Sequence, residues 1–233
     1  MPTDAAPRPT VGVLFDIDGT LLDTGGAGRR SFVRALETVF GWRDEMPYVN
    51  FAGNTDLNVL HQVMAAHRRV LTGPARKAFF EALPKELERA AAHSRPLLFP
   101  GVRVLLERLS VDPRVCLGLV TGNIESCARI KLRQVDLHGH FLLGAFGDEY
   151  ADRARIGRLA LDRMEQAAGG PLKRRFLIGD TPFDVAAARD IGARSMAVAT
   201  GSFAPEALRA AGADHVLPDL SDTKGVWRLL GLA

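Results

Sequence analysis

The chain has 233 residues, of which 47% are hydrophobic and 24% are charged, a composition that is typical of globular proteins and excludes disordered or fibrous ones. This length allows one large domain, or one domain that carries a smaller insertion. The formal net charge is only +3 and no block of basic residues stands out, so no nucleic-acid partner is predicted.

No apolar stretch reaches the roughly 20 residues that a membrane-spanning helix needs, so no membrane partner is predicted. The two cysteines, Cys116 and Cys127, have no metal-binding spacing. The first ten residues lack the apolar segment of a secretory signal and are predicted to be a mobile tail. These features favour a cytoplasmic location, and the oligomeric state is unknown at this stage.

Short apolar runs alternate with helical patterns along most of the chain. Strands are expected at 11–15, 115–120, 141–146, 176–179, 195–199 and 215–217, and helices at 102–109, 124–135, 156–168, 184–191 and 205–211. The strand runs are continuously apolar, which indicates that both faces of the sheet are covered. We therefore predict an α/β fold with a Rossmann-like, doubly wound parallel sheet.

Residues 24–96 interrupt this alternation. Three helices are expected there, at 29–40, 55–70 and 74–92, without a convincing strand. An insertion directly after the first strand would lie over the end of that strand. The predicted division is therefore a core of residues 1–22 and 97–233 and a small α-helical domain of residues 23–96.

The first strand ends on two carboxylates, in the run Asp16-Ile17-Asp18-Gly19-Thr20. Open α/β sheets bind their ligands at the carboxyl ends of their strands. Two carboxylates so close together repel each other and favour a cation or a proton between them. Mg²⁺ is the hard divalent ion that prefers such oxygen ligands, so a metal-assisted reaction on an anionic substrate is predicted.

Two further strands end on polar residues. Thr121-Gly122-Asn123 follows the run 115–120 and opens a helix, which suits phosphate binding at a helix N-terminus. A plain turn with Asn123 as the helix cap is the alternative. Asp180 follows the run 176–179 and can reach a metal, while Asp184 can hold a metal-bound water, cap the next helix, or do both.

A phosphate site also needs a cation, and Arg153 and Arg155 are both candidates just before the helix at 156–168. Either guanidinium would stay charged and could hold phosphate with two parallel hydrogen bonds.

These motifs, in this order, resemble the haloacid dehalogenase-like hydrolase superfamily over essentially the whole core. The helical insertion looks like the small helical cap of that family. The overall pattern, which includes Gly53-Asn54-Thr55-Asp56 in the insertion, looks most like its phosphoglycolate-phosphatase-like branch. The family's Lys-Pro third motif is absent, and Asp152-Arg153 stands in its place. The register against the following helix favours Arg153 over Arg155.

The resemblance implies a phosphoric monoester hydrolase. In it Asp16 is the nucleophile that forms an aspartyl-phosphate, and Asp18 is the general acid and then the base. It also implies a Mg²⁺ site that comprises Asp16, the backbone carbonyl of Asp18, Asp180, and Asp184 through water. The phosphate oxygens are expected to be held by Thr121, Gly122, Asn123 and Arg153.

The substrate implied is a small phosphorylated metabolite, with phosphoglycolate as a candidate at the family level. Two alternatives remain open. One is a phosphosugar mutase, which returns the phosphoryl group to the sugar, and the other is a non-catalytic phosphometabolite-binding protein.

Overall fold

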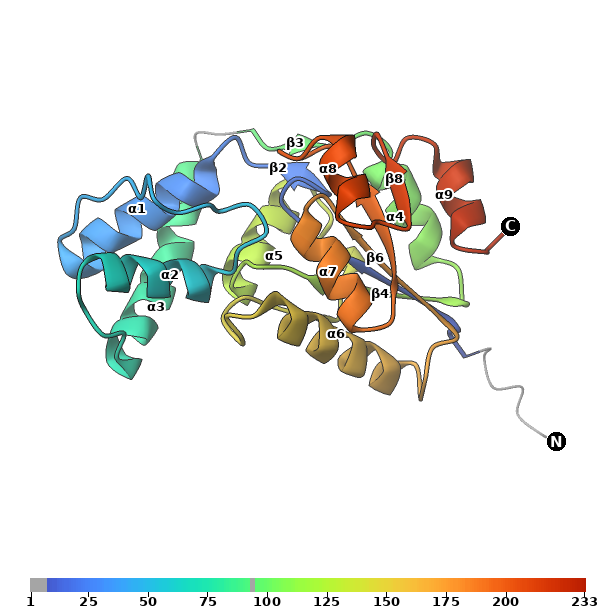
Figure 1. The fold of residues 1–233 in the computed structure, drawn as a ribbon, viewed down its shortest axis with the longest axis horizontal. Coiled ribbons are helices and arrows are strands. Elements are labelled where there is room, and N and C mark those ends of the chain that lie inside the picture. Colours follow the sequence, from blue (N-terminus) through green and yellow to red (C-terminus); the bar gives the residue numbers. More distant parts are fainter. Residues whose placement is uncertain (1–7, 93–94) are drawn as a thin grey trace.

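A six-stranded parallel sheet forms the centre of the larger part of the computed structural model, which describes residues 8–92 and 95–233 (Figure 1). Most of the predicted N-terminal tail therefore lies outside the described residues. The strand order is β5-β4-β1-β6-β7-β8, and all neighbours pair in parallel. The strands are β1 (Val11–Phe15), β4 (Val115–Val120), β5 (Gly144–Ala145), β6 (Arg174–Gly179), β7 (Arg194–Val198) and β8 (His215–Leu217). The predicted fold class is confirmed.

Helices cover both faces of this sheet because alternate side chains of a strand point to opposite faces. One face packs against α4 (Val102–Ser110), α5 (Glu125–Gln134) and α9 (Thr223–Leu229). The other packs against α6 (Arg153–Ala167), α7 (Pro182–Asp190) and α8 (Pro205–Ala210). The fully buried β1 belongs to both layers: Val13 and Phe15 join the first cluster, and Leu14 joins the second.

Three further helices, α1 (Ala27–Phe40), α2 (Asp56–Ala66) and α3 (Gly73–Ala91), lie together at one end of the molecule (Figure 1). We call residues 23–96 the helical insert. The insert has its own apolar cluster, in which the rings of Phe32 and Phe79 lie 4.7 Å apart. Core helix α5 contributes Ile124, Cys127 and Ile130 to the same cluster, so the insert packs directly on the core.

The chain enters and leaves the insert through two short strands that the sequence did not predict. β2 (Leu22–Asp23) and β3 (Leu97–Leu98) pair in antiparallel fashion. Two residues are too few to give a periodic signal. The predicted strand at 141–146 likewise shrinks to the two residues of β5 behind the short 3₁₀ turn η1 (His138–His140), and α9 was not predicted.

Candidate active site

Three adjacent strands, β4, β1 and β6, bring the predicted motifs to one edge of the sheet. Each strand is followed directly by a polar residue: Thr121 after β4, Asp16 after β1 and Asp180 after β6. Asp184 comes from the first turn of α7, and Arg153 is the first residue of α6. The residues predicted to form a site come from four separate segments of the sequence and are neighbours in space.

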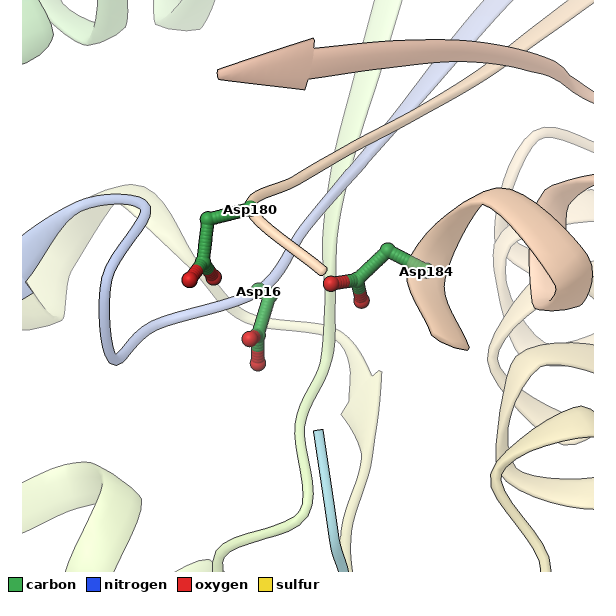
Figure 2. A group of neighbouring side chains, drawn as sticks. All are labelled: Asp16, Asp180 and Asp184. Carbon is green, nitrogen blue, oxygen red and sulfur yellow. The ribbon is translucent and has the colours of Figure 1, made fainter. Parts of the chain in front are cut away.

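Three carboxylates form an acidic cluster at this edge. Asp16, Asp180 and Asp184 each present a carboxylate oxygen within 4.8 Å of the others (Figure 2). All three side chains are buried. Burial and the charges of neighbouring carboxylates raise the pKa of Asp16 to about 6 and that of Asp180 to about 8. The geometry therefore places strongly repelling, desolvated oxygen donors where a hard cation fits.

Arg153 partly neutralises this cluster. Its Nη2 lies 3.0 Å from Asp16 Oδ1 and 2.5 Å from Asp184 Oδ1. Burial tends to lower the pKa of Arg153, but the charges of Asp16 and Asp184 outweigh it and the net direction is upward. Arg155 is exposed and lies over the ring of Tyr150. The structure therefore brings Arg153, and not Arg155, to the carboxylates.

Asp184 also takes part in capping the N-terminus of α7. Thr181 is the N-cap residue of that helix, and its side chain accepts a hydrogen bond from the Asp184 backbone. In return Asp184 Oδ2 accepts hydrogen bonds from the Thr181 backbone N–H and hydroxyl, which completes a capping box. Both carboxylate oxygens of Asp184 are thus engaged, Oδ1 by Arg153 and Oδ2 by Thr181.

Asp18 is not part of the acidic cluster, and its carboxylate is bound by a lysine. Lys131 Nζ donates to both carboxylate oxygens of Asp18, at 2.8 and 2.6 Å, and to Asn123 Oδ1 at 2.6 Å. Asn123 Nδ2 donates to Asp18 Oδ2 at 2.7 Å and to Thr121 Oγ1 at 2.8 Å. Both carboxylate oxygens of Asp18 therefore have partners outside the cluster of Asp16, Asp180 and Asp184.

The segment Thr121-Gly122-Asn123 lines the same cavity as Asp16 and Asp180. The N-cap residue of α5 is Ile124, so Asn123 is not the helix cap that the alternative interpretation required. The reason is that its side chain is used by Thr121, Asp18 and Lys131 instead.

The helical insert is held against this segment by backbone hydrogen bonds. Asp56 N donates to Gly122 O at 2.7 Å, and Leu57 N donates to Gly147 O at 3.3 Å. Asp56 Oδ2 accepts from Ile124 N at 2.8 Å, so a carboxylate of the insert satisfies a free N–H at the start of core helix α5. Hydrogen bonds therefore join the start of α2 directly to the predicted phosphate-binding segment.

A cavity of about 520 Å³ lies between the insert and the core. Asp16, Asp180, Arg153 and Lys131 line its core side. The insert contributes both apolar and polar lining residues: Phe32, Phe51, Val59, Leu83 and Leu87, and Asp23, Thr24, Arg29, Ser31, Asn54 and Asp56. A ligand in this cavity would meet hydrocarbon as well as charge.

The sequence interpretation missed Lys131. A signal was present, because positions 124, 127, 128 and 131 share one face of the helix at i, i+3, i+4 and i+7. Three of these are apolar, so Lys131 belongs to the buried face of α5, where it is only 4% exposed. Burial tends to lower the pKa of Lys131, but the adjacent Asp18 carboxylate outweighs it and the net direction is upward. A lysine buried in this way needs a carboxylate partner.

The family model of the haloacid dehalogenase-like hydrolases matches residues 13–198. The chain belongs to this family. Its relatives include the probable phosphatase IndB of Dickeya dadantii, which is 27% identical and aligns over 91% of each chain. A phosphoglycolate phosphatase of Xanthomonas campestris is 30% identical, over 81% of this chain and 83% of its own. The predicted superfamily, its phosphoglycolate-phosphatase-like branch and the enzyme class, a phosphatase, are thereby confirmed.

Solved structures agree with the fold. A hydrolase from Pseudomonas syringae aligns with a TM-score of 0.72 at 22% identity, covering 94% of this chain and 98% of its own. A putative beta-phosphoglucomutase from Thermotoga maritima aligns with a TM-score of 0.61 at 24% identity, with the same coverage. Among the described residues no helix is both long and apolar enough to cross a membrane.

Proposed function

We propose that the protein is a Mg²⁺-dependent phosphatase that hydrolyses a small phosphorylated metabolite through an aspartyl-phosphate on Asp16. The observation that carries this proposal is the contact of Arg153 with Asp16 and Asp184 inside a buried cluster of three carboxylates. A nucleophile, a cation for phosphate and a set of hard oxygen donors lie within one cavity. Substitution of Arg for the family's usual lysine keeps the charge.

The donor set fits Mg²⁺. Asp16 and Asp180 would be direct ligands, together with the backbone carbonyl of Asp18, whose side chain is turned to Lys131. Asp184 would act through water because both of its carboxylate oxygens have protein partners. The bound cation would offset the charge of the phosphoryl oxygens and of the carboxylates.

In the first half-reaction Asp16 attacks phosphorus, and the bond from phosphorus to the alcohol oxygen breaks. Asp18 gives a proton to that oxygen as it leaves, which is the role of a general acid. Thr121, the Gly122 N–H, Asn123 and Arg153 hold the phosphoryl oxygens. In the second half-reaction Asp18 takes a proton from water, the water attacks phosphorus, and inorganic phosphate leaves Asp16. Covalent catalysis thus divides one slow hydrolysis into two faster steps.

We propose further that the helical insert, residues 23–96, is a cap domain on a core of residues 1–22 and 97–233. The separate apolar cluster of the insert and its entry through the paired strands β2 and β3 support this division. Arg29, Asn54, Thr55 and Asp56 remain candidates for contact with the leaving group.

The size and lining of the cavity indicate which leaving groups it can accommodate. Phosphoglycolate is the substrate in the names of several relatives and is a candidate here. The apolar side chains that the insert contributes to the cavity, such as Phe32, Phe51 and Leu83, favour monoesters with some hydrocarbon in the leaving group. The volume of about 520 Å³ leaves room for them, since sites of roughly 300–1,000 Å³ accommodate drug-sized ligands. In a series of ethyl, butyl and hexyl phosphate the leaving group has constant chemistry. Each CH₂ that enters the cavity contributes up to about 0.8 kcal/mol, or roughly fourfold in kcat/KM.

The decisive experiment measures inorganic phosphate released from phosphoglycolate, sugar phosphates, nucleotides and the alkyl series, with Mg²⁺ and with chelator. Release that requires Mg²⁺ and is abolished in a folded Asp16→Asn variant supports the proposal. Turnover retained in that variant overturns the assignment of Asp16. No release from any compound by the folded wild type favours the alternatives.

Two alternatives give different results in the same assay. A phosphosugar mutase would isomerise a sugar phosphate without net release of phosphate. A non-catalytic phosphometabolite-binding protein would bind and do neither, but Asp16, Asp18, Asp180 and Asp184 are all present in the sequence. A cytoplasmic location is part of the proposal, and it agrees with the free thiols of Cys116 and Cys127.

A further inference from the structure

Lys131 forms a closed polar network with Asp18 and Asn123. An ammonium group has three N–H donors, and the three of Lys131 reach Asp18 Oδ1, Asp18 Oδ2 and Asn123 Oδ1 within 2.8 Å. The Asn123 amide then donates to Asp18 Oδ2 and to Thr121. Each member is therefore oriented by the other two, and the network leaves Lys131 no further donor for a phosphate.

The position of this network matters for chemistry. Asp18 follows the nucleophile Asp16 by two residues, and a free carboxylate there would be attracted to a divalent cation beside Asp16 and Asp180. A carboxylate bound to that cation could not reach the leaving oxygen. Lys131 offers Asp18 a competing partner that is not part of the acidic cluster.

We propose that Lys131 is a positioning residue for the reaction: it holds the Asp18 carboxyl group beside the leaving-group oxygen and away from the metal. This inference rests on the proposed phosphatase function. Lys131 itself touches neither the phosphorus nor the nucleophile. Its effect on the rate passes through the proton that Asp18 gives to the departing alcohol.

The test compares leaving groups in a Lys131→Met variant, assayed with Mg²⁺. Ethyl phosphate needs a proton on its leaving oxygen, whereas p-nitrophenyl phosphate releases a stable anion and does not. The ratio kcat/KM reports the steps up to formation of the aspartyl-phosphate. Since general acid catalysis contributes roughly 10²–10⁴-fold, we expect a loss of at least about 30-fold with ethyl phosphate and of less than about threefold with p-nitrophenyl phosphate.

Two controls accompany this comparison. Lys77→Met removes a lysine that is exposed on the insert and should leave both substrates unaffected. In an Asp18→Asn background, Lys131→Met should lower kcat/KM with ethyl phosphate little further, because the carboxyl group that Lys131 positions is already lost. This double variant also removes both charges together, so it tests the proposal even if Lys131→Met alone leaves Asp18 unpaired and fails to fold.

An equal loss for both substrates would overturn the proposal, since a purely structural role would not depend on the leaving group. A rise in KM for both substrates with weaker inhibition by inorganic phosphate would also overturn it and make Lys131 a phosphate ligand. The proposal would also be overturned if Lys131→Met lowered kcat/KM by the same factor in the Asp18→Asn background as in the wild type. If the wild type releases no phosphate from any substrate, the proposed function fails, and that outcome is distinct from these.

Discussion

At the scale of single residues, Arg153 is the cation that the carboxylates share. Its guanidinium contacts Asp16 and Asp184, whereas Arg155 is exposed beside Tyr150. Arg153→Ala is expected to lower kcat/KM by about 10²–10³-fold, the usual loss when a donor to the transition state is removed. Arg155→Ala is expected to change it by less than about threefold.

The measurement is steady-state phosphate release by both variants, with thermal unfolding as a check on folding. Arg153→Lys retains a positive charge and should recover part of the lost activity. A larger loss in Arg155→Ala would contradict the assignment of the third motif to Arg153.

The ionisation of Asp56, a residue of the insert, makes the stability of the folded protein depend on pH. Burial raises the pKa of Asp56 from 3.8 to about 6, against the opposing effect of the Lys131 charge. The folded protein thus holds this proton more tightly than the unfolded chain. This contribution to stability is therefore complete below about pH 4 and is lost as the pH rises to about 6.

Asp56→Asn keeps an oxygen acceptor for Ile124 N and removes the charge. The variant should gain roughly 1–2 kcal/mol of unfolding free energy relative to wild type when the pH is raised from 4 to 8. Urea unfolding of both proteins at the two pH values measures this difference. An unchanged difference would show that Asp56 ionises freely in the folded state.

The neighbourhood of Asp16, Asp180 and Asp184 could be predicted from the sequence because carboxyl ends of adjacent parallel strands share one edge of the sheet. Register alone also favoured Arg153. Helical spacing could have placed Lys131 on the buried face of α5, but its partner Asp18 lies 113 residues away in the sequence and is known only from the three-dimensional contact. The catalytic and metal-binding roles of these residues stay predictions.

At the scale of elements, the start of α2 and the segment before α5 fit together without room for another atom. A Cβ on Gly122 would lie 1.9 Å from Asn54 O, in the loop that leads into α2. Gly122→Ala therefore forces the insert away from the core. Such overpacking typically costs about 1–3 kcal/mol, and we also expect kcat/KM to fall at least about tenfold.

Chemical unfolding and phosphate release measure both effects. The matched control is Gly139→Ala in η1, where an added Cβ meets nothing within 4 Å. That variant should stay within about 0.5 kcal/mol of wild type. Equal behaviour of the two alanine variants would mean that the contact between Gly122 and Asn54 is dispensable.

Long apolar runs made the main strands predictable. The expected strand at 11–15 and the expected strand at 115–120 coincide with β1 and β4. Helix starts were less accurate: α6 begins at Arg153, three residues early, because Asp152 caps it and no apolar residue marks its first turn. The pair β2 and β3 depends on contact between residues about 75 apart in sequence, which local patterns do not report.

At the scale of the whole molecule, metal binding should be linked to stability. Without a cation, Asp16, Asp180 and Asp184 repel one another in a buried site. A ligand at 100 times its Kd stabilises the folded state by about 2.7 kcal/mol. For a protein of this size that corresponds to a rise in Tm of roughly 5–10 °C.

Asp180→Asn should raise the Tm of the metal-free protein, since it removes one of the repelling charges, and should abolish most of the rise on adding Mg²⁺. Differential scanning calorimetry with Mg²⁺ and with chelator measures both. The exposed pair of Lys77 and Glu81 provides a control, because Glu81→Gln should leave the response to Mg²⁺ intact. A wild-type Tm that does not respond to Mg²⁺ would contradict the proposed metal site.

The pairing of β2 with β3 has a consequence for how such a protein can change over time. Leu22 pairs with Leu98 and Asp23 with Leu97, so the chain leaves the sheet-based part and returns to it at neighbouring positions, roughly 4.7–4.9 Å apart. A two-residue hairpin turn could join them. The helical insert can therefore be regarded as an exchangeable module. A replacement would have to cover the apolar side chains of Ile124, Cys127 and Ile130 and to renew the hydrogen bonds to Gly122 and Gly147. Exchange of this module could give a new substrate range while the reaction chemistry stays the same.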